Sequence, residues 1–158
     1  MYREYVAVTN GIMLAGETIN QPIGRHRRDR IKMAVTSNGN PAVTHIRVMR
    51  KFRAHCLVSA QLETGRTHQI RVHLSHRGFP LVGDVLYGGR VRLPDHPSQA
   101  LTNCLRGFHH QALHAKSLHL THPVTEESMG WTQPPPTSFL YLVQCLAEDT
   151  GSEPVQLV

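Results

Sequence analysis

The sequence lacks several features that would place it in a special class of protein. Its three cysteines, Cys56, Cys104 and Cys145, lie far apart and form no C-x-x-C pair. This argues against a disulfide framework and for reduced thiols. No signal peptide opens the chain, and no apolar run approaches the ~20 residues that span a bilayer. The longest apolar stretch, 139–147, is short and contains Gln144. These absences predict a soluble cytoplasmic protein with no membrane partner.

Acidic residues are also scarce. The 158 residues include 11 Asp and Glu against 17 Lys and Arg, so the formal charge is +6 and the pI is about 9.7. Arginine is the main cation, and its planar, forked donors suit phosphate. The charge therefore favours a polyanionic partner, although a basic but unspecialised enzyme surface would have the same composition. The length and the apolar share of 40% fit one domain or a large part of one.

The hydrophobic pattern predicts strands and helices without strict alternation. The runs 43–52 and 56–62 alternate apolar and polar residues, which predicts adjacent antiparallel strands, each half buried. A helix is expected from about Thr67 to a stop at 77–80. The other expected elements are strands at 2–8, 17–23, 113–120 and 128–133 and helices at 98–106 and 137–147. Together they predict an α+β fold with a mixed, mostly antiparallel sheet flanked by helices. Residues 148–158 read as a polar, frayed tail.

The stretch 63–74 is the point around which the rest of the chain is organised. Gly65 ends a strand pattern and is expected to take a positive φ in a strand-to-helix turn. Thr67 is expected to cap the new helix through its hydroxyl. Arg71 then falls in the first helical turn, beside the free amide groups of the helix start, while Ile70 packs beneath. Such a cationic corner suits an anion, either an RNA phosphate or a carboxylate.

A dense basic run at 24–32 is a second candidate site. It is either a solvated loop or a loop that contacts RNA phosphates, and its place in an otherwise structured chain favours the second interpretation. Its candidate contacts are Arg25, Arg27, Arg28, Arg30 and Lys32. Three residues of the organising stretch, Arg66, His68 and Gln69, are either RNA contacts or supports for the turn. The pattern leaves those two readings open.

The twelve histidines raise the question of a metal site. The three on the expected central helix lack the spacing of H-E-x-x-H. His110 and His114 have an i, i+4 spacing, but His114 falls in an expected strand and no Cys or carboxylate set lies near them in sequence. We therefore expect no metal, and we expect His114 and His122 to support packing and hydrogen bonding.

Several short motifs resemble those of the RNA pseudouridine synthases. The chain contains Gly65-Arg-Thr-His-Gln-Ile-Arg71, Tyr5-Val-Ala7, Pro80-Leu-Val-Gly-Asp84 with Tyr87-Gly-Gly89, and Leu113-His-Ala115 followed by Thr121-His-Pro123. Their order and separation are similar to the ribosomal large subunit pseudouridine synthase D-like branch and cover nearly the whole chain. The resemblance implies part of that family's catalytic fold, with an active cleft across the middle of the sheet.

The resemblance also implies roles for individual residues. Tyr5 matches the tyrosine placed against the flipped base, where a phenol offers a stacking face and a hydroxyl. Arg71 matches the arginine that pairs with the catalytic aspartate and keeps it ionised. The family uses that aspartate with no metal or cofactor, in a motif close to H-R-L-D-x-x-[TS]-G that precedes the tyrosine.

That aspartate motif is missing here. The four aspartates are Asp29, Asp84, Asp95 and Asp149. Asp29 in His26-Arg-Arg-Asp29 lacks the surrounding Leu and Thr/Ser-Gly and follows Tyr5, and Asp84 belongs to a separate motif. We therefore expect residues 1–147 to be the C-terminal part of a pseudouridine synthase catalytic domain, inactive alone, whose substrate is large-subunit rRNA.

Two other interpretations remain. One is a non-catalytic RNA-binding module or half of a split enzyme, and a weaker one is a metal-binding protein. If an N-terminal part is absent, one sheet edge or face should be exposed, and self-association would be one way to cover it.

Overall fold

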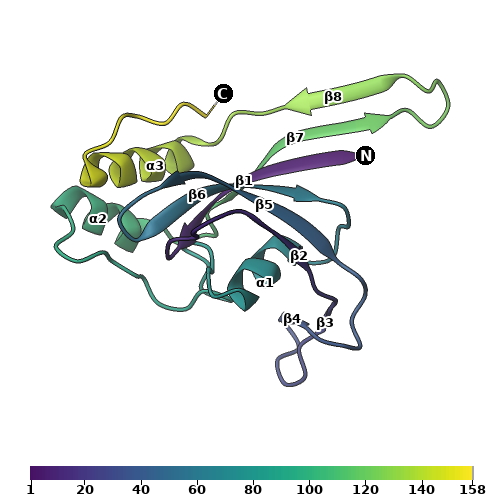
Figure 1. Cartoon of the computed structure of the whole chain (residues 1–158), viewed down its shortest axis with the longest axis horizontal. Helices are drawn as coiled ribbons and strands as arrows, with labels where there is room; N and C mark the ends of the chain where they lie inside the picture. Colours follow the sequence, from purple (N-terminus) through teal and green to yellow (C-terminus); the bar gives the residue numbers. More distant parts are fainter. Residues whose placement is uncertain (158) are drawn as a thin grey trace.

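A six-stranded antiparallel sheet runs through the computed structural model, which describes residues 1–157 (Figure 1). Its strand order is β2-β5-β6-β1-β7-β8, and a separate two-stranded sheet pairs β3 with β4. The strands are β1 (Tyr2–Asn10), β2 (Glu17–Asn20), β3 (Ile23–Arg25), β4 (Met33–Val35), β5 (Val43–Lys51), β6 (His55–Leu62), β7 (Leu113–Thr121) and β8 (Ser128–Thr132). The helices are α1 (Gln69–His76), α2 (Gln99–Gly107) and α3 (Thr137–Thr150). The α+β class and the antiparallel sheet are confirmed.

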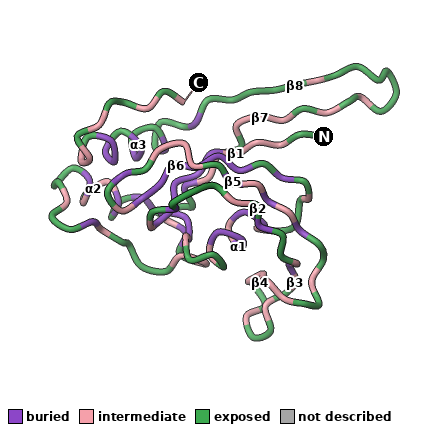
Figure 2. The backbone as a smooth tube through the Cα atoms, in the orientation of Figure 1, coloured by how far each residue is buried: buried purple, intermediate pink, exposed green. Residues whose placement is uncertain are grey.

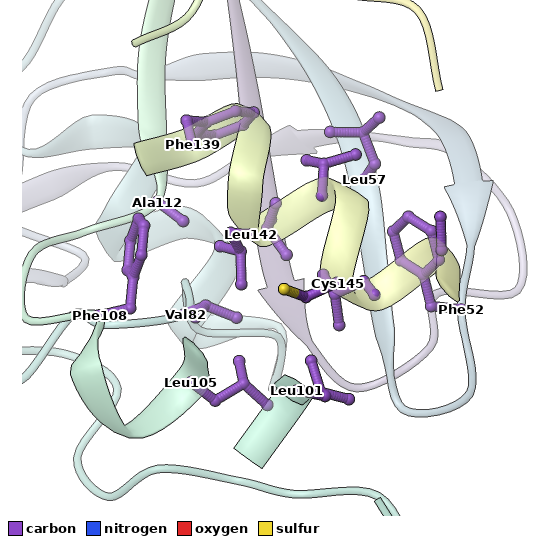
Figure 3. Packing of buried hydrophobic residues seen from close by; sticks show 14 of the residues in the cluster. Phe52, Leu57, Val82, Leu101, Leu105, Phe108, Ala112, Phe139, Leu142 and Cys145 are labelled. Atoms are coloured by element: carbon purple, nitrogen blue, oxygen red, sulfur yellow. The ribbon is translucent and has the colours of Figure 1, made fainter. Parts of the chain in front are cut away.

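Helices cover both faces of the central strands. Successive residues of a strand point to opposite faces, and β1 follows this rule. Its Val6 and Val8 pack with α2 and α3 in one apolar cluster, while Ala7 packs with α1 in another. Figure 3 shows the first cluster, in which side chains of α3 and α2 meet those of the sheet. The sheet is therefore the middle layer of three.

Strand β6 differs from the prediction for 56–62. The sequence pattern predicts one buried face, but seven of the eight residues of β6 are buried. Leu57 packs under α2 and α3, whereas Val58 and Ala60 pack on the α1 side. The half-buried prediction for β6 is wrong because β6 lies between β1 and β5 with helices above and below. The neighbouring β5 has the mixed burial that was expected.

The C-terminal segment also differs from its prediction. Helix α3 continues to Thr150, beyond the expected end at residue 147. The Asp149 side chain is only 3% exposed; its carboxylate accepts hydrogen bonds from Arg53 Nη1 at 2.9 Å and from the Ser98 backbone N–H at 2.7 Å. Val155 and Leu157 pack against the core. Residues 148–157 are thus held by the Arg53–Asp149 ion pair and by apolar contacts, so the expectation of a frayed tail is wrong.

The small β3–β4 sheet carries the basic run and packs against α1. Ile23 and Val72 are the buried members of this contact, with Met33 and Tyr87 packed against them. The expected single piece at 17–23 is instead two strands, because β2 pairs with β5 in the large sheet whereas β3 pairs with β4 in the small one. Packing therefore places the basic run beside the central helix.

The β7–β8 hairpin reaches away from the helices together with the first residues of β1 (Figure 1). No residue of either strand is buried, and Figure 2 draws this hairpin in the pink and green of intermediate and exposed residues. In the described part of the chain, no helix is both long and apolar enough to cross a membrane.

Candidate functional site

The turn before α1 forms in a different way from the one predicted. Helix α1 begins at Gln69, and the residue that takes the left-handed conformation is His68, with φ 56°. Gly65 does not have a positive φ, and Thr67 does not cap the helix, so both predictions are wrong. Gly65 has another effect: a Cβ there would lie 3.2 Å from Cζ of Arg3 and still closer to Nη1, so any side chain at this position would move the Arg3 guanidinium.

Two buried polar side chains tie α1 to β5. Gln69 donates to the Val43 carbonyl and to the Thr44 hydroxyl, both at 3.0 Å, and accepts from the Arg66 backbone N–H at 3.0 Å. His73 bonds Thr44 through Nδ1 and the Gln21 carbonyl through Nε2, each at 2.8 Å. Burial lowers the pKa of His73 despite the opposing effect of the Gln21 carbonyl. These bonds fix the helix start on the sheet.

Arg71 has a buried carboxylate partner within the chain. Its Nε donates to Asp84 Oδ2 at 2.7 Å and its Nη2 donates to Asp84 Oδ1 at 2.9 Å. The Arg71 side chain is 13% exposed and that of Asp84 is 1% exposed. The hydrogen bond with Asp84 raises the pKa of Arg71, more than burial lowers it. Such forked, charge-assisted bonds are short and directional, so the position of the guanidinium is fixed.

Tyr87 also contacts the Arg71 guanidinium. Its ring centroid lies 4.9 Å from Cζ of Arg71, which is a cation–π contact. Its hydroxyl lies 2.8 Å from His68 Nδ1 and accepts from the Met33 backbone N–H at 3.0 Å. Burial and the nearby Arg71 charge lower the pKa of His68, which favours the neutral imidazole. His68, Arg71, Asp84 and Tyr87 thus form one connected cluster, called here the Arg71 corner.

Tyr5 lies on the same face of the sheet as α1. The ring is half buried and packs with Ile70 and Leu74 of α1 in one apolar cluster. On its open side it lines a depression of about 240 Å³, together with Arg3, Lys116 and Trp131 among others. The structure therefore places Tyr5 on the face of the sheet that is covered by α1, the helix that carries Arg71. The expected packing role of Ile70 agrees with its burial.

The predicted RNA-contacting residues fall into two groups. Gln69 is 2% exposed and His68 is engaged with Tyr87, which favours the turn-support interpretation for both. Arg66 is exposed, although its Nε donates to the Pro41 carbonyl at 2.9 Å. His114 bonds the Gln133 carbonyl at 2.8 Å through Nε2, in keeping with a structural role.

The basic run forms an ordered, exposed loop at the tip of the β3–β4 hairpin. His26 Nδ1 accepts from the backbone N–H groups of Arg28 at 3.2 Å and Asp29 at 3.0 Å, which shapes the loop. A depression of about 620 Å³ borders it, lined by Arg25, His26, Arg27, Arg28, Ala34, Val35 and Thr36. A neighbouring depression of about 290 Å³ extends from the same hairpin to Tyr87. The loop and the Arg71 corner are therefore linked through Tyr87, the one member of that cluster that lines this depression.

The pairing of Arg71 with Asp84 was not predicted from the sequence. The sequence signal for this pair is the Pro80–Asp84 and Tyr87–Gly89 motif, whose spacing alone does not connect it to α1. Among residues 1–157, no three His, Cys, Asp or Glu side chains are grouped so that they could hold a metal ion.

The chain is similar in sequence to proteins of known family. The pattern of the family described as RNA pseudouridylate synthase matches residues 1–76. The ribosomal large subunit pseudouridine synthase D of Pseudomonas aeruginosa is 53% identical over 147 residues, which is 93% of this chain and 46% of that protein. Its counterpart in Vibrio parahaemolyticus is 50% identical over 148 residues, 94% of this chain and 46% of the relative. The chain thus spans about half the length of these relatives.

Solved structures agree with the sequence comparisons. Human RNA pseudouridylate synthase domain containing 1 superposes with a TM-score of 0.69 at 27% identity, covering 99% of this chain and 61% of that one. Human RNA pseudouridylate synthase domain containing 4 gives a TM-score of 0.68 at 27% identity, covering 92% and 62%. Fold, motifs and relatives agree, and the chain belongs to the RNA pseudouridylate synthase family.

Proposed function

We propose that this chain supplies the tyrosine and arginine of an RNA pseudouridine synthase active site that acts on large-subunit rRNA. The observation that carries the proposal is the fixed, partly open guanidinium of Arg71 on the Tyr5 face of the sheet. The relatives named above act, by their names, on the ribosomal large subunit. The positive charge of the chain and its basic loop fit a polyanionic substrate.

The reaction is an isomerisation and needs no redox partner. The bond from ribose C1′ to uracil N1 breaks, a bond from C1′ to C5 forms, C5 loses its hydrogen as a proton, and N1 gains a proton. A carboxylate acting on the sugar as a nucleophile or base would begin it. Tyr5 then offers its ring to the base and its hydroxyl to the C5 proton.

Arg71 has donors left for that carboxylate. A guanidinium has five N–H donors, and the two bonds to Asp84 use one on Nε and one on Nη2. Nη1 has no protein acceptor among the described residues. In this proposal Asp84 orients the guanidinium. The free Nη1 then donates a hydrogen bond to the carboxylate of the catalytic aspartate, which lies outside this chain.

None of the four aspartates is proposed as the nucleophile. Asp84 is bound on both oxygens by Arg71, and Asp149 is paired with Arg53 on the α2–α3 side. Asp29 uses Oδ1 to accept the Ile31 N–H within the loop, and Asp95 lies in the connection before α2 with no motif of the family around it. The chain alone is accordingly expected to be inactive.

The test is tritium release from RNA labelled at uridine C5. The chain alone should release none, and adding the part of the Pseudomonas aeruginosa relative outside the matched region should restore turnover. An Asp→Asn change in the H-R-L-D motif of the added part is the control and should abolish the restored activity. Tritium release by the chain alone would contradict the proposal. Tight RNA binding with no turnover in any combination would instead favour the second candidate, a non-catalytic RNA-binding module.

A variant assigns the role of Arg71 within the restored system. Arg71→Ala should lower turnover far more than RNA affinity, because its partner is the carboxylate. Measuring both on the same labelled RNA separates the two effects. An equal loss in both would assign Arg71 to an RNA phosphate.

A further inference from the structure

Arg3 lies beside Tyr5 and has no assigned role. It stands two residues before Tyr5 on β1, and side chains two apart on a strand share a face. Both residues line the depression of about 240 Å³, together with Lys116 and Trp131. Arg3 is therefore a cation on the rim of the surface where the proposed function places the base.

The position of Arg3 is set by the Gly65 turn. Its Cζ and Nη2 each lie 3.2 Å from the point where a Cβ of residue 65 would be, and Nη1 lies closer still. Any side chain at Gly65 would push the guanidinium away. The glycine that opens the Gly65–Arg71 motif thus makes room for Arg3.

Arg3 has no anionic partner within the described residues. Its Nε is buried and makes no hydrogen bond there, and no carboxylate comes within salt-bridge distance of it. Arg53, Arg71 and Arg77, in contrast, are paired with Asp149, Asp84 and Glu17. The buried Nε is closed to solvent, so an acceptor from outside residues 1–157 would have to bind the Nη donors, for which no hydrogen bond is found among the described residues.

Chemistry points to a phosphate as that acceptor. The guanidinium fork binds two phosphate oxygens at once, and a nucleotide carries its phosphate one sugar away from its base. Lys116 adds a second cation to the depression, although it is shared with Glu4 at 3.9 Å. We infer that Arg3 binds a backbone phosphate of the RNA strand whose uridine is placed against Tyr5, an inference that rests on the proposed function.

The test measures binding of this chain to a short single-stranded oligouridylate across a series of salt concentrations. Arg3→Gln should weaken binding about tenfold and reduce the slope of log K against log salt by about 0.7, the value for one phosphate on a single strand. Arg3→Lys should keep the slope, because the charge remains, and bind less tightly than wild type, because the fork is lost. Arg106→Gln, which removes an exposed arginine at the end of α2, is the matched control and should change neither quantity.

A second variant tests the same contact without touching Arg3. Gly65→Ala displaces the guanidinium and should reproduce the affinity loss of Arg3→Gln, with thermal unfolding confirming that both variants fold. If Arg3→Gln fails to fold, Arg3→Lys and Gly65→Ala still decide the question.

The outcomes separate this inference from the proposed function. Arg3→Gln and Gly65→Ala binding like Arg106→Gln would overturn the role of Arg3 alone. A wild-type chain that does not bind RNA would overturn both. If Arg3→Gln instead impairs only assembly with the remaining part of the relative, Arg3 binds a protein carboxylate, and the phosphate inference is wrong.

Discussion

Strands β6 and β7 have similar lengths and the same antiparallel pairing, yet their surroundings are opposite. Seven of the eight residues of β6 are buried, and none of the nine in β7 is. The difference comes from cover: α1 lies on one face of β6 and α2 with α3 on the other, while β7 and β8 extend beyond all three helices (Figure 1). Pairing alone therefore does not create a core.

The part of the sheet that the helices cover and the part that they leave open differ in what they contribute to the candidate site. The covered half fixes α1, and with it the Arg71 corner, by buried polar bonds and apolar packing. The uncovered hairpin and the start of β1 contribute Trp131, Lys116, Arg3 and Tyr5 to an open surface. A bare two-stranded hairpin is marginal in water, so this region depends on the body and on whatever it binds.

The largest difference between the two regions should appear when a leucine is shortened. Leu142 on α3 is fully buried in the cluster of Figure 3, so Leu142→Ala should lower the free energy of unfolding by about 3–5 kcal/mol. Leu120→Ala in β7, where the side chain is half exposed, should cost under about 1 kcal/mol. Urea unfolding of both variants measures this. Equal losses would mean that the hairpin is as well packed as the body.

The ion pairs should follow the same division. Asp84→Asn leaves Arg71 without a charged partner in a site where the carboxylate was 1% exposed, and should cost about 3 kcal/mol. Glu4→Gln breaks the pair with Lys116, whose atoms lie 3.9 Å apart near the hairpin, and should cost under about 1 kcal/mol. Unfolding at low and high salt is the measurement, and a larger loss for Glu4→Gln would reverse the comparison.

Local sequence patterns predicted where the strands and helices lie better than they predicted which faces of these elements are buried. Alternation located β5 and β6, and the stop signal around Gly78 correctly ended α1. The pattern could not show that Leu57, on the opposite face to Val58, would also be covered, because that cover comes from helices far along the chain. Asp149 looked like part of a polar tail for the same reason, since its partner Arg53 is 96 residues away.

The candidate site shows the same limit. The family resemblance identifies Tyr5 and Arg71 as candidate catalytic residues. It does not predict the pairing of Arg71 with Asp84, because that pairing depends on how the loop after α1 folds back. The sequence predicts a positive φ at Gly65. In the structure the absence of a side chain matters instead, because the guanidinium of Arg3, from the start of the chain, lies against Gly65. Contacts between distant segments are decided by packing and leave no trace in local spacing.

Lowering the pH should destabilise the helix-covered part of the fold more than the β7–β8 hairpin. His55 at the start of β6 is fully buried, and the Arg92 backbone beside it only partly offsets the effect of burial on its pKa. Burial lowers the pKa of His55 below its ordinary 6.5. A histidine with a lowered folded pKa stabilises the fold above the unfolded value and loses that contribution as the pH falls through the folded value.

Replacing the His55 imidazole should make the unfolding free energy depend less on pH in the acid range. His55→Leu should reduce the slope of unfolding free energy against pH below 6.5 by up to about 1.4 kcal/mol per pH unit, the value for one proton. The matched control is His119→Leu in the exposed part of β7, which should keep the wild-type slope. Unfolding midpoints measured across the acid range would decide, and an unchanged slope in His55→Leu would assign the acid response to other groups, such as the buried His73.

The smallest expected effect concerns the edges of the sheet. One edge is β2, which has only four residues, and the other is β8, whose five residues have no covering element among those described. An uncovered edge strand offers its free backbone groups to another chain, so weak self-association through β8 is expected at high protein concentration. Sedimentation velocity over a concentration series measures it. Ser128→Lys with Thr132→Lys should abolish it by placing charge on the edge, while Thr137→Lys with Gln144→Lys on exposed positions of α3 should not. A wild-type chain that stays monomeric throughout would mean that exposure of β8 alone does not produce a partner surface.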